Sequence, residues 1–461
     1  MSTNNKNNLI IKISSLIKAG FFLVLSFIYN WIYSRKITNG CLYNRGRTIL
    51  FTSSAIEWRR VYDLDRNENI LGNQFFNMIL NCLIKKKNYS IFGTYQFASR
   101  LRDFAVFYEK QKAQKFTFLP LELFMDLKIF LKFFQVRFIK NRTLKSLKRD
   151  YQSYIFAKSL GNLLDTLVPD IILVSNEKGF FEKQLIIAGK KRNIPTIALQ
   201  HGNIFQTHPY YITKDLSARE YFPDITCLYG ESDREVLLNH SVYTPDDLVV
   251  TGSPRYDIIY HADRIYSRDK FCMDYNIPLN HQIILWTTQS HGMTDEENTR
   301  QLDIVFGCCD NIPGITLVIK QHQGEKKRHY RIIQSYCRNH SCNTLMLPKD
   351  SDTFEALYVS DLVITYHSTT GREAAAFKKP LVVLDTQDSV GYSKEGVGVI
   401  VSSIQEAEQV ISRLLKDDRE LAVNRDEYIK RYFYAIDGKS TERVVQLIEK
   451  VLSDQVKPVT L

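Results

Sequence analysis

The sequence predicts an α/β protein with two Rossmann-like parallel-sheet domains that face a cleft, together with an additional helical N-terminal region. Three observations lead to this prediction. Short runs of β-branched and apolar residues alternate with helical patterns from residue 165 onward, which is typical of a doubly wound parallel sheet. The alternation occurs in two blocks separated by a charged segment near 260–280, and 461 residues suffice for two domains. Polar and glycine-containing loops follow the strands, at the edge where such sheets bind ligands.

The most informative stretch is Asp361–Asp385, DLVITYHSTTGREAAAFKKPLVVLD, which has the pattern of strand, polar turn, helix and strand. The apolar run near its start is typical of a strand buried on both faces. Three hydroxyl residues then stand where a helix N-cap is expected, and Glu373 follows Thr370 at the capping-box spacing. A helix N-terminus beyond a parallel strand is a natural phosphate site, although the hydroxyls alternatively serve only as caps. The candidate nucleotide-binding residues of this stretch are His367, Ser368, Thr369, Thr370, Gly371 and Glu373.

The composition indicates a globular protein with an anionic partner. Hydrophobic residues make up 44% and charged residues 24% of the chain, values that exclude collagen and disorder. The formal net charge of +11 suits a nucleotide donor, an acidic membrane surface or a nucleic acid. The 8 cysteines include no CxxC pair, which favours a reduced, cytosolic compartment. The neighbouring Cys337, His340 and Cys342 are too irregularly spaced to predict a metal site.

The N-terminal region, residues 1–40, contains an apolar segment, Leu9–Tyr33, that is flanked by cations. Its uncharged core, Ala19–Tyr33, is shorter than the roughly 20 residues that cross a bilayer. Aromatic residues at its end replace the small residues of a signal-peptide cleavage site. Two interpretations remain, an interfacial helix on a membrane or a buried first helix.

The next segment predicts one strand followed by helices. Thr48–Thr52 is a candidate first strand, and residues 70–160 show long helical patterns without strand punctuation. Within them, Lys128–Arg149 combines many Lys and Arg with an apolar stripe and no acidic residue, so it predicts a basic amphipathic helix. Such a helix either binds anionic lipid or packs its apolar face into a core.

The first clear α/β block carries the candidate catalytic base. Its predicted strands lie within 169–175, 194–202, 224–229 and 247–250. Glu177 and His201 follow neighbouring strands at tips that face the expected cleft, and either could accept the proton of an acceptor hydroxyl. Glu177 could instead orient His201 or cap a helix, and Glu231 and Asp233 are interpreted as helix-start residues. The acceptor-side loops contain Gln200, Gly202, Gly252 and Pro254.

The second block predicts strands at Gln282–Thr288 and Gly314–Gln321, ahead of the stretch at 361–385. Lys320 and His322 stand at the end of the second of these strands, where they could stabilise phosphate charge; alternatively they are a solvated strand end and a turn histidine. The polar loop after the first strand adds Ser290, His291 and Gly292 as candidate nucleotide-binding residues. We therefore expect an N-terminal domain at 41–260 with a basic helical insertion at 70–160, a C-terminal domain at 275–440, and a helix and tail at 440–461.

The ordered motifs ALQHG, LYGESD, VTGSPRYD, VIKQHQGE, SDLVITYHSTTGREAAAFKKPLVVLD and DGKSTERVV resemble the GT-B superfamily. In particular, they resemble the CDP-glycerol glycerophosphotransferase and capsule polysaccharide transferase group, near the UDP-N-acetylglucosamine 2-epimerases, over residues 165–450. The resemblance implies that the C-terminal domain binds an activated nucleotide donor and that the N-terminal domain binds the acceptor. By position, Lys320 and His322 fall in the family's K-x-H-P motif, and the turn at His367 falls in its phosphate and ribose loop. Gln323 stands where the family has proline, a departure that loosens this turn.

The resemblance implies a metal-independent transferase, since no D-x-D motif occupies a convincing loop, and no cofactor is expected. The donor would be a nucleotide-activated sugar or polyol phosphate, and the acceptor a cell-surface polysaccharide or a lipid-linked glycan. Two alternatives remain, a UDP-N-acetylglucosamine 2-epimerase-like enzyme and a non-catalytic nucleotide- or carbohydrate-binding subunit. The further expected partner is an anionic membrane surface rather than a nucleic acid, with the protein cytoplasmic and peripheral at the inner face of the cell membrane.

Overall fold

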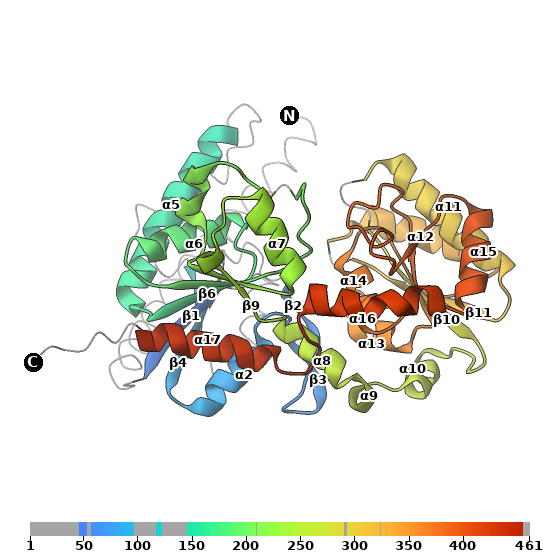
Figure 1. Ribbon diagram of the computed structural model, residues 1–461, viewed down its shortest axis with the longest axis horizontal. Coiled ribbons are helices and arrows are strands. Elements are labelled where there is room, and N and C mark those ends of the chain that lie inside the picture. Colours follow the sequence, from blue (N-terminus) through green and yellow to red (C-terminus); the bar gives the residue numbers. More distant parts are fainter. Residues whose placement is uncertain are drawn as a thin grey trace, which may run out of the picture. The chain divides into compact units, whose positions relative to one another are not determined.

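The computed structural model describes residues 46–52, 57–95, 117–121, 145–208, 210–289, 293–322 and 324–454. They form two parallel sheets with surrounding helices and one separate antiparallel hairpin (Figure 1). The chain divides into two compact units. The first unit comprises Met1–Ala55, Leu83–Ile197 and Glu220–Pro223, and the second comprises Ile56–Cys82, Ala198–Arg219 and Asp224–Leu461.

The first sheet has seven strands in the order β5-β4-β1-β6-β7-β8-β9. The strands are β1 (Arg47–Thr52), β4 (Tyr89–Tyr95), β5 (Thr117–Pro120), β6 (Ile171–Val174), β7 (Thr196–Leu199), β8 (Ile225–Leu228) and β9 (Leu248–Val250). Ile49 of β1 lies opposite Ile91 of β4 on one side and Ile171 of β6 on the other. Every residue of β6 and β7 is buried, as expected for strands covered on both faces. The helices that connect these strands are α2 (Asn77–Lys86), α5 (Lys145–Leu167), α6 (Phe180–Lys190) and α7 (Glu231–His240).

The second sheet has six strands in the order β12-β11-β10-β13-β14-β15. The strands are β10 (Gln282–Thr287), β11 (Ile315–Lys320), β12 (Asn343–Met346), β13 (Leu362–Thr365), β14 (Leu381–Val383) and β15 (Val399–Ile400). In chain order this arrangement is 3-2-1-4-5-6, the Rossmann order, in which ligands bind where the direction of the crossovers reverses. The reversal lies between β10 and β13, which are neighbours in the sheet.

Alternate residues of β10 supply two separate cores, one on each face of this sheet. Ile284 and Trp286 pack into the cluster that includes α11 (Asp295–Asn311), α12 (Lys327–Asn339) and α15 (Ile404–Leu414). Ile283 and Leu285 pack into the other, with α10 (Arg268–Tyr275), α13 (Thr353–Val359) and α14 (Thr369–Ala376). The remaining helices of this part are α8 (Asp257–Tyr260), α9 (Ala262–Ile265), α16 (Arg419–Phe433) and α17 (Ser440–Asp454). The sheet is therefore covered on both sides by helices (Figure 1).

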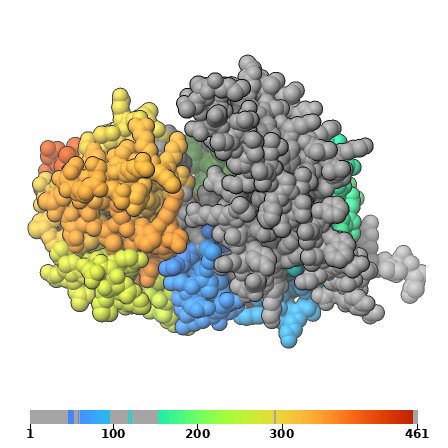
Figure 2. Space-filling view, turned by 180° about the vertical axis from the view of Figure 1, so that it is seen from behind, coloured from blue at the N-terminus to red at the C-terminus, as the bar shows by residue number. Residues whose placement is uncertain are grey.

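The hairpin consists of β2 (Trp58–Asp63) and β3 (Glu68–Asn73), which pair in antiparallel register. The Asp63 carboxylate closes its turn by accepting the backbone N–H groups of Asp65 and Arg66. Tyr62 and the partly buried Leu64 pack against the core that β10 and α13 share. Figure 2 shows the hairpin surface, in blue, against yellow-green and orange segments of the same unit.

The two Rossmann-like sheets and the order of their strands confirm the expected fold class. The expectation that residues 70–160 contain no strand is wrong, because β4 and β5 lie within this range. The apolar run of β4 is interrupted by Ser90, Gly93 and Thr94, and β5 has only 4 residues. Neither segment therefore produces a strong strand pattern. The predictions for Leu9–Tyr33, and for Lys128–Arg149 as far as residue 144, lie outside the described residues.

Within the described part of the chain, none of the helices combines the length and the apolar character needed to cross a bilayer.

A buried ion pair joins α14 to α7 inside the second unit. The Nη1 and Nη2 atoms of Arg372 donate to the two carboxylate oxygens of Asp233 at 2.9 and 3.2 Å. The two side chains are 1% and 0% exposed, and the ring of Tyr432 lies 5.0 Å from the guanidinium. Asp233 thus lies in the first turn of α7 as expected, but its carboxylate forms an ion pair with Arg372. A pair this deeply desolvated is strongly destabilising to break.

We expect Asp233→Asn to lower the free energy of unfolding by about 3–5 kcal/mol, because Arg372 then keeps a buried charge without its carboxylate. The matched control is Glu231→Gln on the same helix, where the half-exposed carboxylate pairs with Arg234. Loss of that exposed pair should cost about 0–1 kcal/mol. Urea denaturation of both variants measures the difference, and equal losses would contradict a structural role for the buried pair.

Candidate functional site

The candidate donor site lies at the crossover reversal of the second sheet. The hydroxyl of Thr287, at the end of β10, donates to the hydroxyl of Thr365 at the end of β13, at 2.8 Å. Two residues beyond each of these threonines, the side-chain amide of Gln289 contacts Nε2 of His367. These contacts hold together the two strand tips from which the predicted nucleotide-binding residues extend.

Ser368 is the N-cap of α14, and its side-chain oxygen accepts the backbone N–H of Thr370 at 3.2 Å. The expected capping box between Thr370 and Glu373 is therefore wrong, because the cap stands two residues earlier than Thr370. Glu373, 1% exposed, instead accepts a 2.5 Å hydrogen bond from Nη1 of Arg255. Thr369 begins the helix, and the hydroxyl of Thr370 lies 3.0 Å from that of Ser368.

The hydroxyl of Tyr392 is inserted into the first turn of α14. It donates to the carbonyl of Ser368 at 2.6 Å and accepts the backbone N–H of Arg372 at 3.1 Å, so it bridges two groups that otherwise bond directly in a helix. Burial raises the pKa of Tyr392 to about 12, so the hydroxyl remains a donor. Its ring fills the space beside Gly371, where a Cβ atom would lie 2.6 Å from Cε2.

Asn203 connects the Gln200–Gly202 loop to the same helix start. Its Nδ2 atom donates to the Tyr392 hydroxyl at 3.2 Å, and its Oδ1 atom is buried without a partner among the described residues. The Gln200 amide is also buried, and it donates to the carbonyl of Gly202 at 2.7 Å. The loop predicted to serve the acceptor thus reaches the loop predicted to bind the donor.

His201 stacks on Tyr211, with ring centroids 5.8 Å apart. Its Nδ1 atom lies 3.0 Å from the Tyr211 hydroxyl, and Tyr211 is fully buried. The hydroxyl of Ser241 fixes this segment by donating to the carbonyl of Tyr211 at 2.9 Å. When Nδ1 donates to the tyrosine oxygen, Nε2 is left as an acceptor, which is the form that a general base requires.

Lys320 is the last residue of β11 and His322 follows the strand, and the two side chains differ in exposure. Lys320 is buried, and its ammonium group donates to the carbonyl of Lys349 at 2.8 Å. The exposed His322 accepts the backbone N–H of Gly324 at Nδ1 at 3.0 Å. This contact leaves Nε2 of the neutral ring as the protonated nitrogen, which can donate to an oxyanion. Ser290, His291, Gly292 and Gln323 lie outside the described residues.

Thr288 and Glu325 support the His322 turn. The Thr288 hydroxyl accepts the backbone N–H of His322 at 3.3 Å and donates to Glu325 at 2.5 Å. The other oxygen of Glu325 contacts Nδ1 of His329 at 2.6 Å. This buried group of side chains was not predicted, because its members are ordinary polar residues that meet only in the fold.

Glu177 lies in the first unit, at the crossover reversal of the first sheet between β1 and β6, and it is fully buried. The neighbouring Lys178 is also buried, which lowers the pKa of its ammonium group to about 8, against the opposing influence of Glu177. The Lys178 ammonium stacks over Phe222 at 4.0 Å. The catalytic role of Glu177 therefore stays a prediction.

Gly252 and Pro254 belong to a turn that holds α17. Gly252 has a φ of +73°, and a Cβ atom there would lie 2.5 Å from the Ser440 hydroxyl. Pro254 begins a short 3-10 turn, after which the Asp257 carboxylate accepts the backbone N–H groups of Ser440 and Thr441, each at 2.8 Å. These contacts are structural, and an acceptor-binding role of this turn stays a prediction.

In the parts of the chain that the structure describes, no group of three or more His, Cys, Asp or Glu side chains is arranged to hold a metal ion.

The family model of CDP-glycerol:poly(glycerophosphate) glycerophosphotransferases matches residues 91–450 of this chain. No curated protein matches the sequence significantly.

Solved structures share the fold at low sequence identity. The UDP complex of S. aureus MnaA is 17% identical, with a TM-score of 0.57 over 88% of this chain and 97% of that chain. The UDP-GlcNAc 2-epimerase of Neisseria meningitidis, bound to UDP-GlcNAc, is 16% identical, with a TM-score of 0.59 over 88% and 100%. CalG4, the calicheamicin glycosyltransferase, is 10% identical, with a TM-score of 0.52 over 90% and 100%. These likenesses show a GT-B fold.

We expect Gly371→Ala to lower the free energy of unfolding by about 1–3 kcal/mol, because its Cβ would overlap the buried Tyr392 ring. The displaced helix start should also weaken binding of UDP or CDP. Gly202→Ala is the matched control, since no atom lies within 4 Å of a Cβ there. Thermal unfolding and nucleotide titration measure both effects, and an unchanged melting temperature for Gly371→Ala would contradict the packing argument.

We expect Tyr211→Phe to lower kcat by about tenfold with little change in KM, because the ring stack remains while the hydroxyl that hydrogen-bonds Nδ1 of His201 is lost. The 15N NMR signals of the His201 ring should show a changed tautomer population. Tyr210→Phe is the control, because that side chain is 67% exposed on the same loop. Unchanged ring signals in Tyr211→Phe would show that Tyr211 only packs against the histidine.

Proposed function

The chain belongs to the CDP-glycerol:poly(glycerophosphate) glycerophosphotransferase family, and from this premise we propose that it transfers a polyol-phosphate or sugar unit from a nucleotide-activated donor. The acceptor in this proposal is a cell-surface polysaccharide or a lipid-linked glycan. The observation that carries the proposal is the contact of Asn203 with Tyr392 at the start of α14. This contact links the loop that contains the candidate base His201 to the start of α14, where we propose that the donor phosphates bind.

The donor phosphates in this proposal occupy the N-terminal end of α14. The helix dipole favours an anion there, and the hydroxyls of Ser368 and Thr370 offer polar contacts to it. Nε2 of His322 donates a hydrogen bond to the leaving phosphate, and this contact strengthens as negative charge develops. The proposal needs neither a metal ion nor a cofactor.

Transfer begins when Nε2 of His201 accepts the proton of an acceptor hydroxyl. For a polyol-phosphate donor, the hydroxyl oxygen forms a bond to the phosphorus that carries the polyol. The bond from that phosphorus to the bridging oxygen breaks, and the bridging oxygen leaves with its electron pair as part of a nucleoside monophosphate. The proton on His201 is then released to water. Sugar transfer would follow the same proton path with attack at the anomeric carbon.

The proposed place of action is the cytoplasmic face of the cell membrane, where a lipid-linked acceptor is available. The net charge of +11 and the apolar segment Leu9–Tyr33 support peripheral attachment to anionic lipid.

The purified protein should release nucleotide from one of a panel of UDP-, CDP- and CMP-activated donors only when acceptor is present, and excess EDTA should not reduce the rate. His322→Ala should lower turnover by about 100-fold, since a hydrogen bond to developing charge is worth about 3 kcal/mol. His240→Ala, on the last turn of α7, is the matched control and should retain activity.

Four outcomes would contradict the proposal. Acceptor-free interconversion of sugar nucleotides would identify an epimerase, and nucleotide binding without turnover would identify a binding subunit. Full activity in His322→Ala would remove the assignment of the leaving-group contact. An absolute requirement for Mg²⁺ would overturn the metal-independent scheme.

A further inference from the structure

Lys349 lies in the loop 347–352, which follows β12 at the ligand-binding edge of the second sheet. All six strands pair in parallel, so this loop, the His322 turn and the start of α14 lie at the same edge. The exposed Lys349 donates its ammonium group to the carbonyl of Glu325 at 3.1 Å, and the backbone N–H of Glu325 donates to the carbonyl of His322 at 3.1 Å. This contact brings the charge of Lys349 one strand spacing, about 4.8 Å, closer to the donor site.

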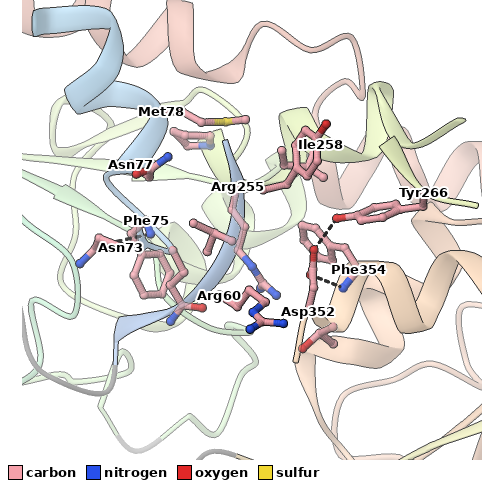
Figure 3. A pocket seen from close by; sticks show the side chains of 15 residues that line it. Arg60, Asn73, Phe75, Asn77, Met78, Arg255, Ile258, Tyr266, Asp352 and Phe354 are labelled. Atoms are coloured by element: carbon pink, nitrogen blue, oxygen red, sulfur yellow. Dashed lines mark hydrogen bonds between the residues drawn. The ribbon is translucent and has the colours of Figure 1, made fainter. Parts of the chain in front are cut away.

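The loop 347–352 is anchored at both ends. At its start, the backbone N–H of the buried Leu347 donates to a carbonyl of β11 at 3.0 Å. At its end, the carboxylate of Asp352 accepts the backbone N–H of Phe354 at 2.9 Å and the hydroxyl of Tyr266 at 2.6 Å (Figure 3). The backbone that carries Lys349 is therefore fixed before any ligand binds.

Lys320 holds the middle of the same loop. Its ammonium group donates to the carbonyl of Lys349 at 2.8 Å. Lys320 is only 4% exposed, so it presents little of its side chain to a ligand at the edge of the sheet. The two lysines are therefore suited to different roles, Lys320 to hold the loop and Lys349 to contact a ligand.

Glu325 connects the exposed ammonium of Lys349 with the exposed imidazole of His322. Its buried carboxylate contacts Nδ1 of His329 and accepts the hydroxyl of Thr288, and the oxygen of this hydroxyl accepts the backbone N–H of His322. Its carbonyl accepts the ammonium of Lys349. Because this carbonyl is neutral, the contact orients the ammonium group without neutralising its charge.

We propose that Lys349 binds the phosphates of the nucleotide donor and that Lys320 is a positioning residue that acts through Lys349. This inference rests on the proposed function, in which those phosphates lie between His322 and the start of α14. The neutral ring of His322 donates one hydrogen bond but carries no charge, so the negative charge of a diphosphate calls for a cation at the same turn. The ammonium group of Lys349 supplies it, and hydrogen bonds from a cation to phosphate are stronger than those from a neutral donor.

The test is calorimetric titration of the full-length protein with CDP and UDP, and with the matching nucleosides cytidine and uridine. Lys349→Met keeps the length of the side chain and removes its charge. It should weaken binding of the preferred diphosphate at least tenfold and leave the affinity for the matching nucleoside unchanged. The matched control is Lys416→Met, which removes the same exposed charge at the opposite edge of the sheet, where the carbonyl of Leu415 accepts the amide of Gln282 at the start of β10. This variant should bind normally.

A double variant separates the roles of the two lysines. Lys320→Met should weaken diphosphate binding several-fold, but the double variant should bind no more weakly than Lys349→Met alone, because Lys320 acts only through Lys349. Losses that multiply in the double variant would show that Lys320 contacts the phosphate itself and would overturn its positioning role. The phosphate contact of Lys349 is overturned if Lys349→Met and Lys416→Met lose equally, if the nucleosides lose as much as the diphosphates, or if neither diphosphate binds measurably.

Failure of this inference and failure of the proposed function give different results. Diphosphate binding that depends on Lys349 in a protein without transferase turnover keeps the phosphate contact and removes the reaction. Acceptor-dependent turnover that is unchanged in Lys349→Met keeps the reaction and removes the contact.

Discussion

The first turn of α14 imposes the constraint on which the rest of the candidate site depends. The backbone N–H groups at a helix start need partners from outside the helix. Here the Ser368 side chain satisfies one of them, and the Tyr392 hydroxyl takes the N–H of Arg372 while it also holds Asn203. Gly371 is needed because the Tyr392 ring occupies the space of its side chain. One phenol therefore fixes the helix, the preceding turn and a loop from the first sheet.

Two adjacent residues of α14 extend this arrangement through charge. Arg372 pairs with Asp233 of α7, and Glu373 pairs with Arg255 of the TGSPRYD turn. Arg372 and Glu373 are each 1% exposed, so each charge has lost its water and depends on its partner. Such pairs contribute little net stability compared with apolar packing, but a misplaced partner is costly. Their effect is to restrict α14 to one orientation relative to α7 and to the turn before α8.

Part of this arrangement is readable from the sequence. The buried strands and the cap at Ser368 follow from local patterns, because apolar runs and capping hydroxyls act over a few residues. The half-exposed edge strands β12 and β15 gave no such pattern. The contact of Asn203 with Tyr392 spans 189 residues, and nothing local distinguishes either side chain from an ordinary loop residue. The position of Glu373 suggested a capping box, yet its charge is used by a residue 118 positions away.

The hydrogen bonds at Nδ1 of His201 and of His322 differ in direction, so the two rings are suited to different steps of the proposed reaction. At His322, a backbone N–H points at Nδ1, and since a backbone amide can only donate, the neutral ring carries its proton on Nε2. That nitrogen can donate to a leaving phosphate but cannot accept a proton. At His201, the partner of Nδ1 is a hydroxyl, which can accept as well as donate, so this contact is compatible with the neutral tautomer in which Nε2 is the basic nitrogen. In the proposed reaction, hydrogen-bond direction therefore favours His201 over His322 as the proton acceptor, independently of where the two residues occur in the motifs.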